Sequence, residues 1–532
     1  MSPGARAPQG SALAGVQPGR LFTASCISLI STAVVFSTIT SMLGQIRDQF
    51  GLTNAQVGFW VGSMTIVGFP IAIVILGPLC DALGMRVLMR IAFLCHIVGV
   101  LLMVFATGLA MLAAGALLLA LGNGTVEAAC NPLTATLFPD RKTEKLNKFH
   151  MWWPGGLVLG GLAAYGIDKI DPSVWKGIGY AAWQIKVVLV LIPTIIYGIL
   201  FTGQKFPSTE RVQAGISFGG MVKATLLRPL FIILFFCMMI TASIELGPNR
   251  WMGEAMKGAL ASFGENAGIL ALVYISALMA VLRYFAGPLV HSLSNAGVLL
   301  LSAALSGVGL LLLTYAGHSA LMVFVTATIF GAGICYFWPT MLGTAAERIP
   351  KGGALALAML GGVGNLAVGF IAVPLMGVIT DSYGYDKLVD GKTMETKVVL
   401  TEVVAAYPAM KITTTDKEAA AAIQEAADMA ATVLKESPED HLSMNTPKAL
   451  RLAESAAPNS EVGKKAHDLL APADEYGTLM SFRWVSALSI ILVLVFGGLY
   501  LRDRAKGGYK AEKIVKEGLA EGFGDGIPPN QL

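Results

Sequence analysis

Charged residues are scarce in this chain of 532 residues. Asp, Glu, Lys and Arg together make up 14% of it, whereas an ordinary soluble domain carries about 25%. Hydrophobic residues make up 55%. A chain so poor in charge is neither disordered nor built to bind nucleic acid, and it is not an ordinary soluble enzyme. We therefore expect a protein whose partner is the lipid bilayer.

Signals for catalysis and for cofactor binding are also missing. The six cysteines lie in apolar stretches without the spacing of a zinc site or a disulfide framework. No glycine-rich segment is followed by Lys-Ser or Lys-Thr, so the sequence gives no support for ATP-driven transport. No nucleophile, histidine and acid group together. We expect no enzymatic activity, no metal and no cofactor.

Long apolar stretches are abundant instead. Each is long enough to cross a bilayer as a helix, and twelve such stretches cannot all be hidden in a water-soluble core. They lie at 21–43, 57–80, 87–107, 110–138, 150–168, 183–203, 228–250, 266–290, 296–316, 319–346, 353–380 and 477–501. The sequence thus predicts an all-α integral membrane protein with twelve transmembrane helices.

The charges that are present divide the chain into two compartments. Residues 381–476 carry 17 acidic and 10 basic residues, a balance of −7, while the rest of the chain carries +11. Basic residues gather in alternate short loops, which places both termini in the cytoplasm and the acidic segment outside the cell (inner) membrane. Within this insert we expect helices over 416–436 and 448–470, in a solvated module rather than a cap over the outer mouth.

The domain organisation follows from these stretches. A cytoplasmic tail (1–20) precedes an N-terminal six-helix bundle (21–203). A cytoplasmic linker (204–227) leads to the C-terminal six-helix bundle (228–501), which contains the insert 381–476 and is followed by a cytoplasmic tail (502–532). The two halves are internally similar, because GPLCDAL at 77–83 returns as GPLVHSL at 287–293, 210 positions later. We therefore expect two pseudo-symmetric bundles.

The loop after the second helix carries a recognisable motif. It reads Gly-x-Leu-x-Asp-x-x-Gly-x-Arg, with the acid available to pair with basic residues and the second glycine suited to a tight turn. Its residues are Gly77, Asp81, Gly84, Arg86 and the nearby Arg90. On this motif and the duplicated halves, the chain resembles the major facilitator superfamily, and the resemblance implies that this loop takes part in gating.

The fourth predicted helix contains an acid, Glu127, within an apolar stretch. Burying a charge there costs about 2.5–3.5 kcal/mol, so such a residue faces a cavity or a partner. Asn131 follows one turn later on the same face. The run Glu127-x-Ala129-x-Asn131-Pro132 resembles the fucose–proton symporter family, which implies monosaccharide symport with protons through this glutamate. The alternative is a salt bridge that only locks two helices.

The C-terminal half offers further candidates. Glu245 stands before Gly247-Pro248, which predicts an interrupted helix, and it could be a second coupling acid. Arg283 lies within the eighth helix and needs a carboxylate partner, either Glu245 or Glu127, or else extends to the interface. Polar and aromatic residues that could contact a sugar complete the set: Trp152, Asn249, Trp251, Tyr336, Trp338 and Asn365.

These observations predict a secondary active transporter. It would move a small polar solute, with a monosaccharide favoured, by alternating access coupled to protons or sodium, and we expect it to act as a monomer. One alternative is an organic-anion (carboxylate) carrier that holds its substrate with Arg283. A second alternative, of another class, is a membrane receptor that binds solute without moving it.

Overall fold

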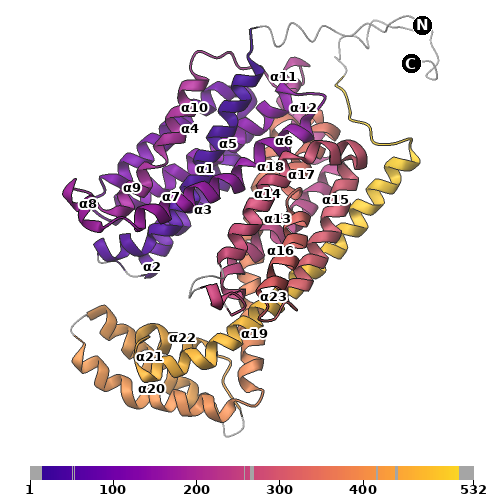
Figure 1. Cartoon of the computed structure of the whole chain (residues 1–532). Coiled ribbons are helices and arrows are strands. Elements are labelled where there is room, and N and C mark those ends of the chain that lie inside the picture. The colour runs from indigo at the N-terminus through magenta and orange to yellow at the C-terminus, as the bar shows by residue number, and fades with distance from the viewer. Residues whose placement is uncertain are drawn as a thin grey trace, which may run out of the picture.

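The computed structural model describes residues 15–514, apart from 51, 53, 257, 264–268, 415–416 and 438–440. All regular structure among these residues is helical. Figure 1 shows two helical bundles side by side and a smaller helical module at one end. The predicted helix 416–436 begins at Lys417 here, because residue 416 lies outside the described residues. The tails 1–14 and 515–532 lie outside them as well.

The first bundle precedes two short linker helices. The bundle consists of α1 (Pro18–Phe50), α2 (Asn54–Val57), η1 (Gly58–Ser63), α3 (Met64–Leu83), α4 (Met85–Val104), α5 (Leu109–Leu137), α6 (Lys142–His150), α7 (Trp152–Asp168), α8 (Pro172–Gly177), α9 (Ala182–Val188) and α10 (Leu191–Phe201). The linker helices are α11 (Glu210–Gln213) and α12 (Phe218–Leu226).

The second bundle and the module make up the rest. They consist of α13 (Pro229–Ala255), η2 (Ala261–Phe263), α14 (Ile269–Tyr284), α15 (Ala286–Leu313), α16 (Ala320–Ile334), α17 (Phe337–Arg348), η3 (Pro350–Gly352), α18 (Gly353–Ala367), η4 (Val368–Ala372), α19 (Val373–Val389), α20 (Thr393–Thr413), α21 (Lys417–Glu436), α22 (Thr446–Ala456) and α23 (Glu461–Ala505).

The apolar stretches of the sequence form the expected membrane helices. Ten helical segments of the described chain are long and apolar enough to cross a bilayer. The shorter apolar helices α7 and α14 bring the number to the predicted twelve. Several crossings join two helices end to end, such as α9 with α10 and α16 with α17. The all-α membrane fold is thus confirmed.

The two ends of the bundles differ. The start of α1 and the end of α23 lie at one end, which we call the terminal face, and the helical module lies at the opposite end, the insert face (Figure 1). Contacts between the bundles run through α3 on α18, α6 on α17 and α7 on α14. Near the terminal face the approach is so close that a Cβ atom at Gly77 would collide with Ala358, and one at Gly343 with Thr143. The bundles are therefore closed against each other there.

The internal repeat extends to the backbone. Gly84 follows α3 with φ of 84° and Ser294, 210 positions later, has φ of 63° at a kink inside α15. A positive φ is easy for glycine and strained for serine. Both halves thus turn at the same place, although only the first half keeps the glycine.

The predicted interruption at Gly247-Pro248 is wrong. Helix α13 continues through Pro248 to Ala255, because neighbouring helices in a bundle can compensate for the one amide that proline lacks. The break occurs instead in the tenth crossing, where α16 ends at Ile334 and α17 begins at Phe337. This break leaves a free carbonyl end and a free amide end in the middle of the second bundle.

The insert forms a helical module with a core of its own. Apolar residues from α19, α20, α21, α22 and the start of α23 pack together, separately from the bundle cores. The guanidinium of Arg451 on α22 bonds Asp381 on α19 at 2.7 Å and Asp474 on α23 at 2.5 Å. Because α23 runs unbroken for 45 residues from the module into the bundle, module and bundle form one continuous body.

Two expectations for the insert need correction. The helix predicted over 448–470 is divided, since α22 ends at Ala456 and α23 begins at Glu461, where Ser460 caps it by accepting the Gly463 amide. The helix α20 was not predicted at all. Its sequence mixes apolar and charged residues without a strong period, which is why the pattern gave no signal.

Candidate functional site

A buried polar cluster surrounds the acid of the fourth crossing. Glu127 lies on α5 and is only 4% exposed. The Asn131 amide, one turn further along α5, donates to Glu127 Oε2 at 2.5 Å. Asn131 Oδ1 then accepts from His150 Nε2 at 2.9 Å, and the same nitrogen lies 3.9 Å from Glu127 Oε2. In this cluster the carboxylate faces an amide and an imidazole, and no Lys or Arg pairs with it.

A second buried cluster lies in the other bundle. Arg283 on α14 is 1% exposed, and its Nη2 donates to Glu245 Oε1 on α13 at 2.8 Å. Its Nε donates to the carbonyl of Cys335 at the end of α16. A cation at the carbonyl end of a broken helix is favourable, because it balances the helix dipole. Of the two partners predicted for Arg283, the structure places Glu245 against it.

His150 joins the two clusters. Its side chain bonds Asn131 in the first bundle, and its carbonyl accepts from Arg283 Nη1 of the second bundle at 3.0 Å. With the imidazole neutral, Glu127, Glu245 and Arg283 sum to one negative charge in a region from which water is largely excluded. An excess negative charge in a poorly solvated site favours the uptake of a cation or a proton.

Three buried polar atoms on α13 lack a hydrogen-bond partner within the described structure. They are Glu245 Oε2, Asn249 Oδ1 and Trp251 Nε1. Buried polar groups are normally satisfied, so unpaired ones are candidates for contact with a ligand or water. The first two are acceptors one helical turn apart. Trp251 packs towards Gly377 of α19, which separates it from the other two.

The aromatic residues divide differently from the prediction. Trp152 packs with the core of the first bundle, next to α1. Its neighbour Trp153 packs on the same core. The Trp153 ring also lies 5.0 Å from that of Phe36 and 6.2 Å from that of Phe69, in a group that includes Ala358 of α18. Trp153, which was not among the predicted residues, is therefore an aromatic residue at the bundle interface.

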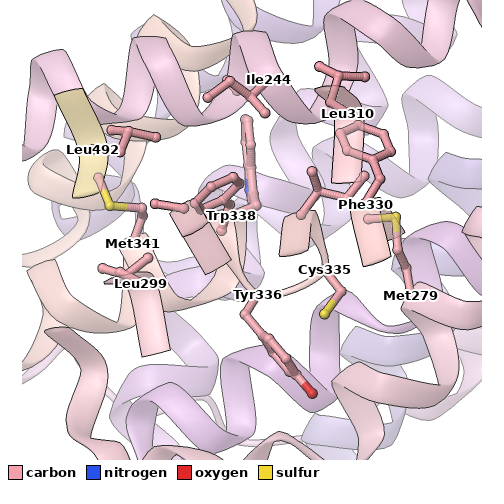
Figure 2. Close-up of a cluster of buried hydrophobic side chains, with 14 of the residues drawn as sticks. Ile244, Met279, Leu299, Leu310, Phe330, Cys335, Tyr336, Trp338, Met341 and Leu492 are labelled. Carbon is pink, nitrogen blue, oxygen red and sulfur yellow. The ribbon is translucent and has the colours of Figure 1, made fainter. Parts of the chain in front are cut away.

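Tyr336 and Trp338 flank the start of α17. The Tyr336 hydroxyl donates to the Leu282 carbonyl of α14 at 3.1 Å. Tyr336 and Trp338 both belong to the core cluster that includes Ile244, and in Figure 2 the hydroxyl end of Tyr336 points away from the other labelled side chains. Asn365 on α18 donates to the Gly361 carbonyl of its own helix and is half-buried. Both Tyr336 and Trp338 are mainly packing residues in this state.

The motif loop binds the linker rather than its own arginines. Asp81 accepts from Arg211 Nε of α11 at 2.6 Å and from the Thr209 hydroxyl at 2.6 Å. Arg86 and Arg90 are exposed. The basic partner of Asp81 is thus Arg211, which the sequence analysis had not selected, because its position 130 residues away along the chain gave no local signal.

The equivalent loop of the second half has a histidine where the first half has the acid. His291, at the position that matches Asp81, lies 3.4 Å from Glu144 of α6. Burial alone would raise the pKa of Glu144, but hydrogen bonds and charges from Arg141 and Lys148 lower it to about 2. The Glu144 carboxylate is therefore ionised and holds three basic groups at the terminal face. In the described part of the chain no three His, Cys, Asp or Glu residues group as a metal site would require.

Comparisons with known proteins agree with this architecture. Residues 22–253, a little under half of the chain, match the family model described as Major Facilitator Superfamily. A gentisate transporter of Corynebacterium glutamicum is 25% identical over 352 residues, which cover 62% of this chain and 75% of that protein.

Two solved structures show the same fold at low sequence identity. FucP, the fucose:proton symporter of E. coli, in its outward conformation is 18% identical, with a TM-score of 0.54 over 68% of this chain and 92% of that one. A bacterial homologue of the human lysosomal transporter Spinster, in an inward-facing conformation, is 17% identical, with a TM-score of 0.58 over 93% of this chain and 98% of that one.

Proposed function

We propose that this chain, a multi-pass membrane transporter of the major facilitator superfamily, carries a small neutral polyhydroxy solute such as a monosaccharide together with a proton. The family and the fold are the premise. The observation that carries the rest is Glu127, a buried carboxyl that is hydrogen-bonded to Asn131, lies close to His150 and forms no salt bridge with a Lys or Arg of the described residues.

Glu127 suits the role of proton carrier for an electrostatic reason. A carboxylate without a cation in a poorly solvated region can become neutral by taking up a proton, and the loaded carrier then crosses the bilayer without an excess charge. Glu245 is less suited, because Arg283 already compensates its charge at 2.8 Å. We therefore assign proton coupling to Glu127 and give Glu245 a role in holding Arg283 and in contacting the substrate.

The solute-binding groups follow from the unpaired atoms. Glu245 Oε2 and Asn249 Oδ1 are acceptors that a sugar hydroxyl could satisfy by donating to them. Trp153, between the bundles, offers an apolar face of the kind that stacks on a sugar ring. Arg283 gives one N–H each to Cys335, His150 and Glu245, so three of its five N–H groups and its one counter-charge are already engaged within the protein.

Alternating access supplies the mechanism. The bundles rock about the site, so that it opens first to one side of the membrane and then to the other. We take the terminal face as cytoplasmic, following the distribution of basic residues in the loops. The closed terminal face, with Asp81 on Arg211, then corresponds to a state that is closed towards the cytoplasm.

An organic anion is the second candidate substrate. The 25% identical relative is a gentisate transporter, and gentisate is an aromatic carboxylate. Such a substrate could take the place of Glu245 on Arg283, which is the only buried cation of the two clusters described above. The two candidates differ in what Arg283 does: it stays paired during sugar transport and changes partner during anion transport.

Transport by Glu127→Gln in proteoliposomes tests the proposal. Radiolabelled monosaccharides and aromatic carboxylates are offered with and without an inward proton gradient, and solute counterflow is measured separately. Glutamine keeps the shape and the hydrogen bond to Asn131 but cannot release a proton. We expect gradient-driven accumulation to fall at least tenfold while counterflow persists. Glu144→Gln, an acid outside the site, is the matched control.

The outcomes separate the alternatives. Accumulation that Glu127→Gln leaves unchanged would refute the assignment of proton coupling. Sodium-dependent accumulation in the unmodified chain would replace the proton by sodium. Carboxylates accumulating in preference to sugars would favour the anion carrier, whereas binding without counterflow would make the protein a receptor.

A further inference from the structure

The chain after α23 lies against the terminal face of the second bundle. The Tyr509 hydroxyl donates to Glu347 Oε2 at 2.6 Å, and its ring lies under the Arg348 guanidinium at 4.3 Å. Three residues later, the Glu512 amide donates to the Glu347 carbonyl at 2.8 Å, and its carboxylate pairs with Arg228. The segment 506–514 is therefore held at several points along its length.

Glu347 is the residue through which this segment meets the other bundle. Its Oε1 accepts from the Thr143 amide at 3.1 Å and from the Thr143 hydroxyl at 2.7 Å. Thr143 stands in the first turn of α6, where backbone amides have no partner within the helix. The side chain of Arg141, the residue at the N-cap position, makes no capping hydrogen bond. A carboxylate of one bundle thus caps a helix of the other.

The second oxygen of Glu347 fixes where the carboxylate points. Oε2 accepts from Tyr509 at 2.6 Å and from the Asn295 amide at 3.0 Å. Asn295 also lies 2.9 Å from the Thr143 hydroxyl, so the same few atoms join α6, α15, α17 and the tail. Burial raises the pKa of the Tyr509 hydroxyl, which therefore remains protonated and able to donate.

We infer that Tyr509 is a positioning residue for closure of the terminal face. With Asn295 it holds the Glu347 carboxylate in the orientation that caps α6, so the C-terminal segment acts as a latch on the closed state. The contacts of the segment 506–514 described above are all with the second bundle. The helix whose start they help to cap, α6, belongs to the first bundle. The latch does not depend on which solute is carried or on Glu127.

The two bundles approach so closely at this point that loss of the single Tyr509 hydroxyl should affect their contact. Gly343, one turn before Glu347, leaves no room for a Cβ beside Thr143, so the bundles touch at backbone distance here. If the Glu347 carboxylate turns away from α6, the Thr143 amide loses its partner and the carboxylate remains as a poorly solvated charge. Removing one charge-assisted hydrogen bond typically changes an equilibrium by about tenfold or more.

Hydrogen–deuterium exchange of the full chain in nanodiscs tests the latch without any substrate. Tyr509→Phe removes only the hydroxyl, and Tyr500→Phe on α23 is the matched control, because its hydroxyl makes no hydrogen bond within the described part of the chain. We expect exchange of the segment 142–150 to rise about tenfold in Tyr509→Phe. The same segment should be unchanged in Tyr500→Phe.

A double variant identifies the route of the effect. Glu347→Gln should also raise exchange of 142–150, and Tyr509→Phe with Glu347→Gln should be no faster than Glu347→Gln alone, because both act on one carboxylate. Equal exchange in Tyr509→Phe and Tyr500→Phe would overturn the inference. Fully additive effects would overturn it too, since Tyr509 would then act without Glu347. Neither result bears on proton coupling, which the transport assay tests separately.

Discussion

Each of the two bundles contributes one buried carboxyl to the polar clusters of the candidate site, but the surroundings of these two carboxyls differ. In the first bundle Glu127 meets an amide and an imidazole, and in the second Glu245 meets the guanidinium of Arg283. A compensated charge has no reason to change its state, whereas an uncompensated one in the same surroundings does. The repeat thus has an ion pair in one half and, in the other half, a carboxyl that contacts only neutral side chains, and the proposed proton coupling rests on this difference.

The same inversion occurs at the terminal face. Asp81 of the first half binds a cation of the linker, while His291 at the matching position of the second half lies against an anion, Glu144. The backbone turn survives in both halves, at Gly84 and Ser294. The repeat thus conserves the backbone turn more faithfully than the charge of the side chains. We expect the function to depend on these differences between the halves.

Breaking the buried pair should have the largest effect. Arg283→Met leaves Glu245 buried without a cation, and Glu245→Gln leaves Arg283 without an anion. Each should lower the free energy of unfolding by about 3–5 kcal/mol. The double variant Glu245→Gln with Arg283→Met should recover most of the loss, because no charge then remains unpaired. Thermal and denaturant unfolding in detergent measure these differences.

The same experiment on Glu127 sharpens the contrast between the halves. Glu127→Gln removes a charge that forms no salt bridge with a Lys or Arg of the described residues, so it should change the unfolding free energy by less than about 1 kcal/mol. If Glu127→Gln lowered the free energy of unfolding as much as Glu245→Gln does, Glu127 would also belong to a stabilising pair. The two bundles would then not differ in this respect.

Filling the closest contact between the bundles should have the next largest effect. Gly343→Ala places a Cβ on Thr143, and overpacking of this kind costs about 1–3 kcal/mol. The closed state bears this cost, so the terminal face should open more often, as seen by faster hydrogen exchange of 142–150. Gly155→Ala is the matched control at the same interface, since its new Cβ would lie 3.9 Å from Ala280. Equal behaviour of the two variants would contradict a tight closure at Gly343.

The two equivalent loops, which contain Asp81 and His291, should respond unequally to substitution of these residues. Asp81→Asn leaves Arg211 without its carboxylate, and we expect exchange of the linker segment 208–216 to rise about tenfold. His291→Asn leaves Glu144 with Arg141 and Lys148 still in place, so exchange of 142–150 should rise less than about threefold. A larger rise in exchange for His291→Asn than for Asp81→Asn would contradict this prediction, because the loop of the second half would then depend more on its contact than the loop of the first half.

The sequence predicted the fold more completely than it predicted the site. Lipid allows no other explanation for twelve apolar stretches, so the number of crossings was determined by composition alone. The site required helix rotation and long-range partners. Periodicity could not distinguish Trp152 from Trp153, or reveal that Asp81 binds Arg211, because such contacts depend on how separate helices pack. The acids Glu127 and Glu245 could be found, since a charge in an apolar stretch is itself a signal.

The smallest effect should come from replacing Glu144, whose charge Arg141 and Lys148 already compensate. Glu144 has an ordinary pKa of 4.5, and its basic neighbours lower this to about 2 in the folded chain. A lowered pKa stabilises the folded state in full above pH 4.5, and the contribution is lost only as the pH falls towards 2. Between pH 5 and 8 the charge of Glu144 is therefore constant.

Glu144→Gln should consequently leave the pH dependence of uptake unchanged. We expect the midpoint of the profile between about pH 5 and 8 to shift by less than about half a pH unit, whereas Glu127→Gln should flatten the profile. Uptake into proteoliposomes at a series of external pH values measures both. A clear shift in Glu144→Gln would place the proton-sensitive step at the terminal face instead of at Glu127, because only a group that titrates in this range can move the midpoint.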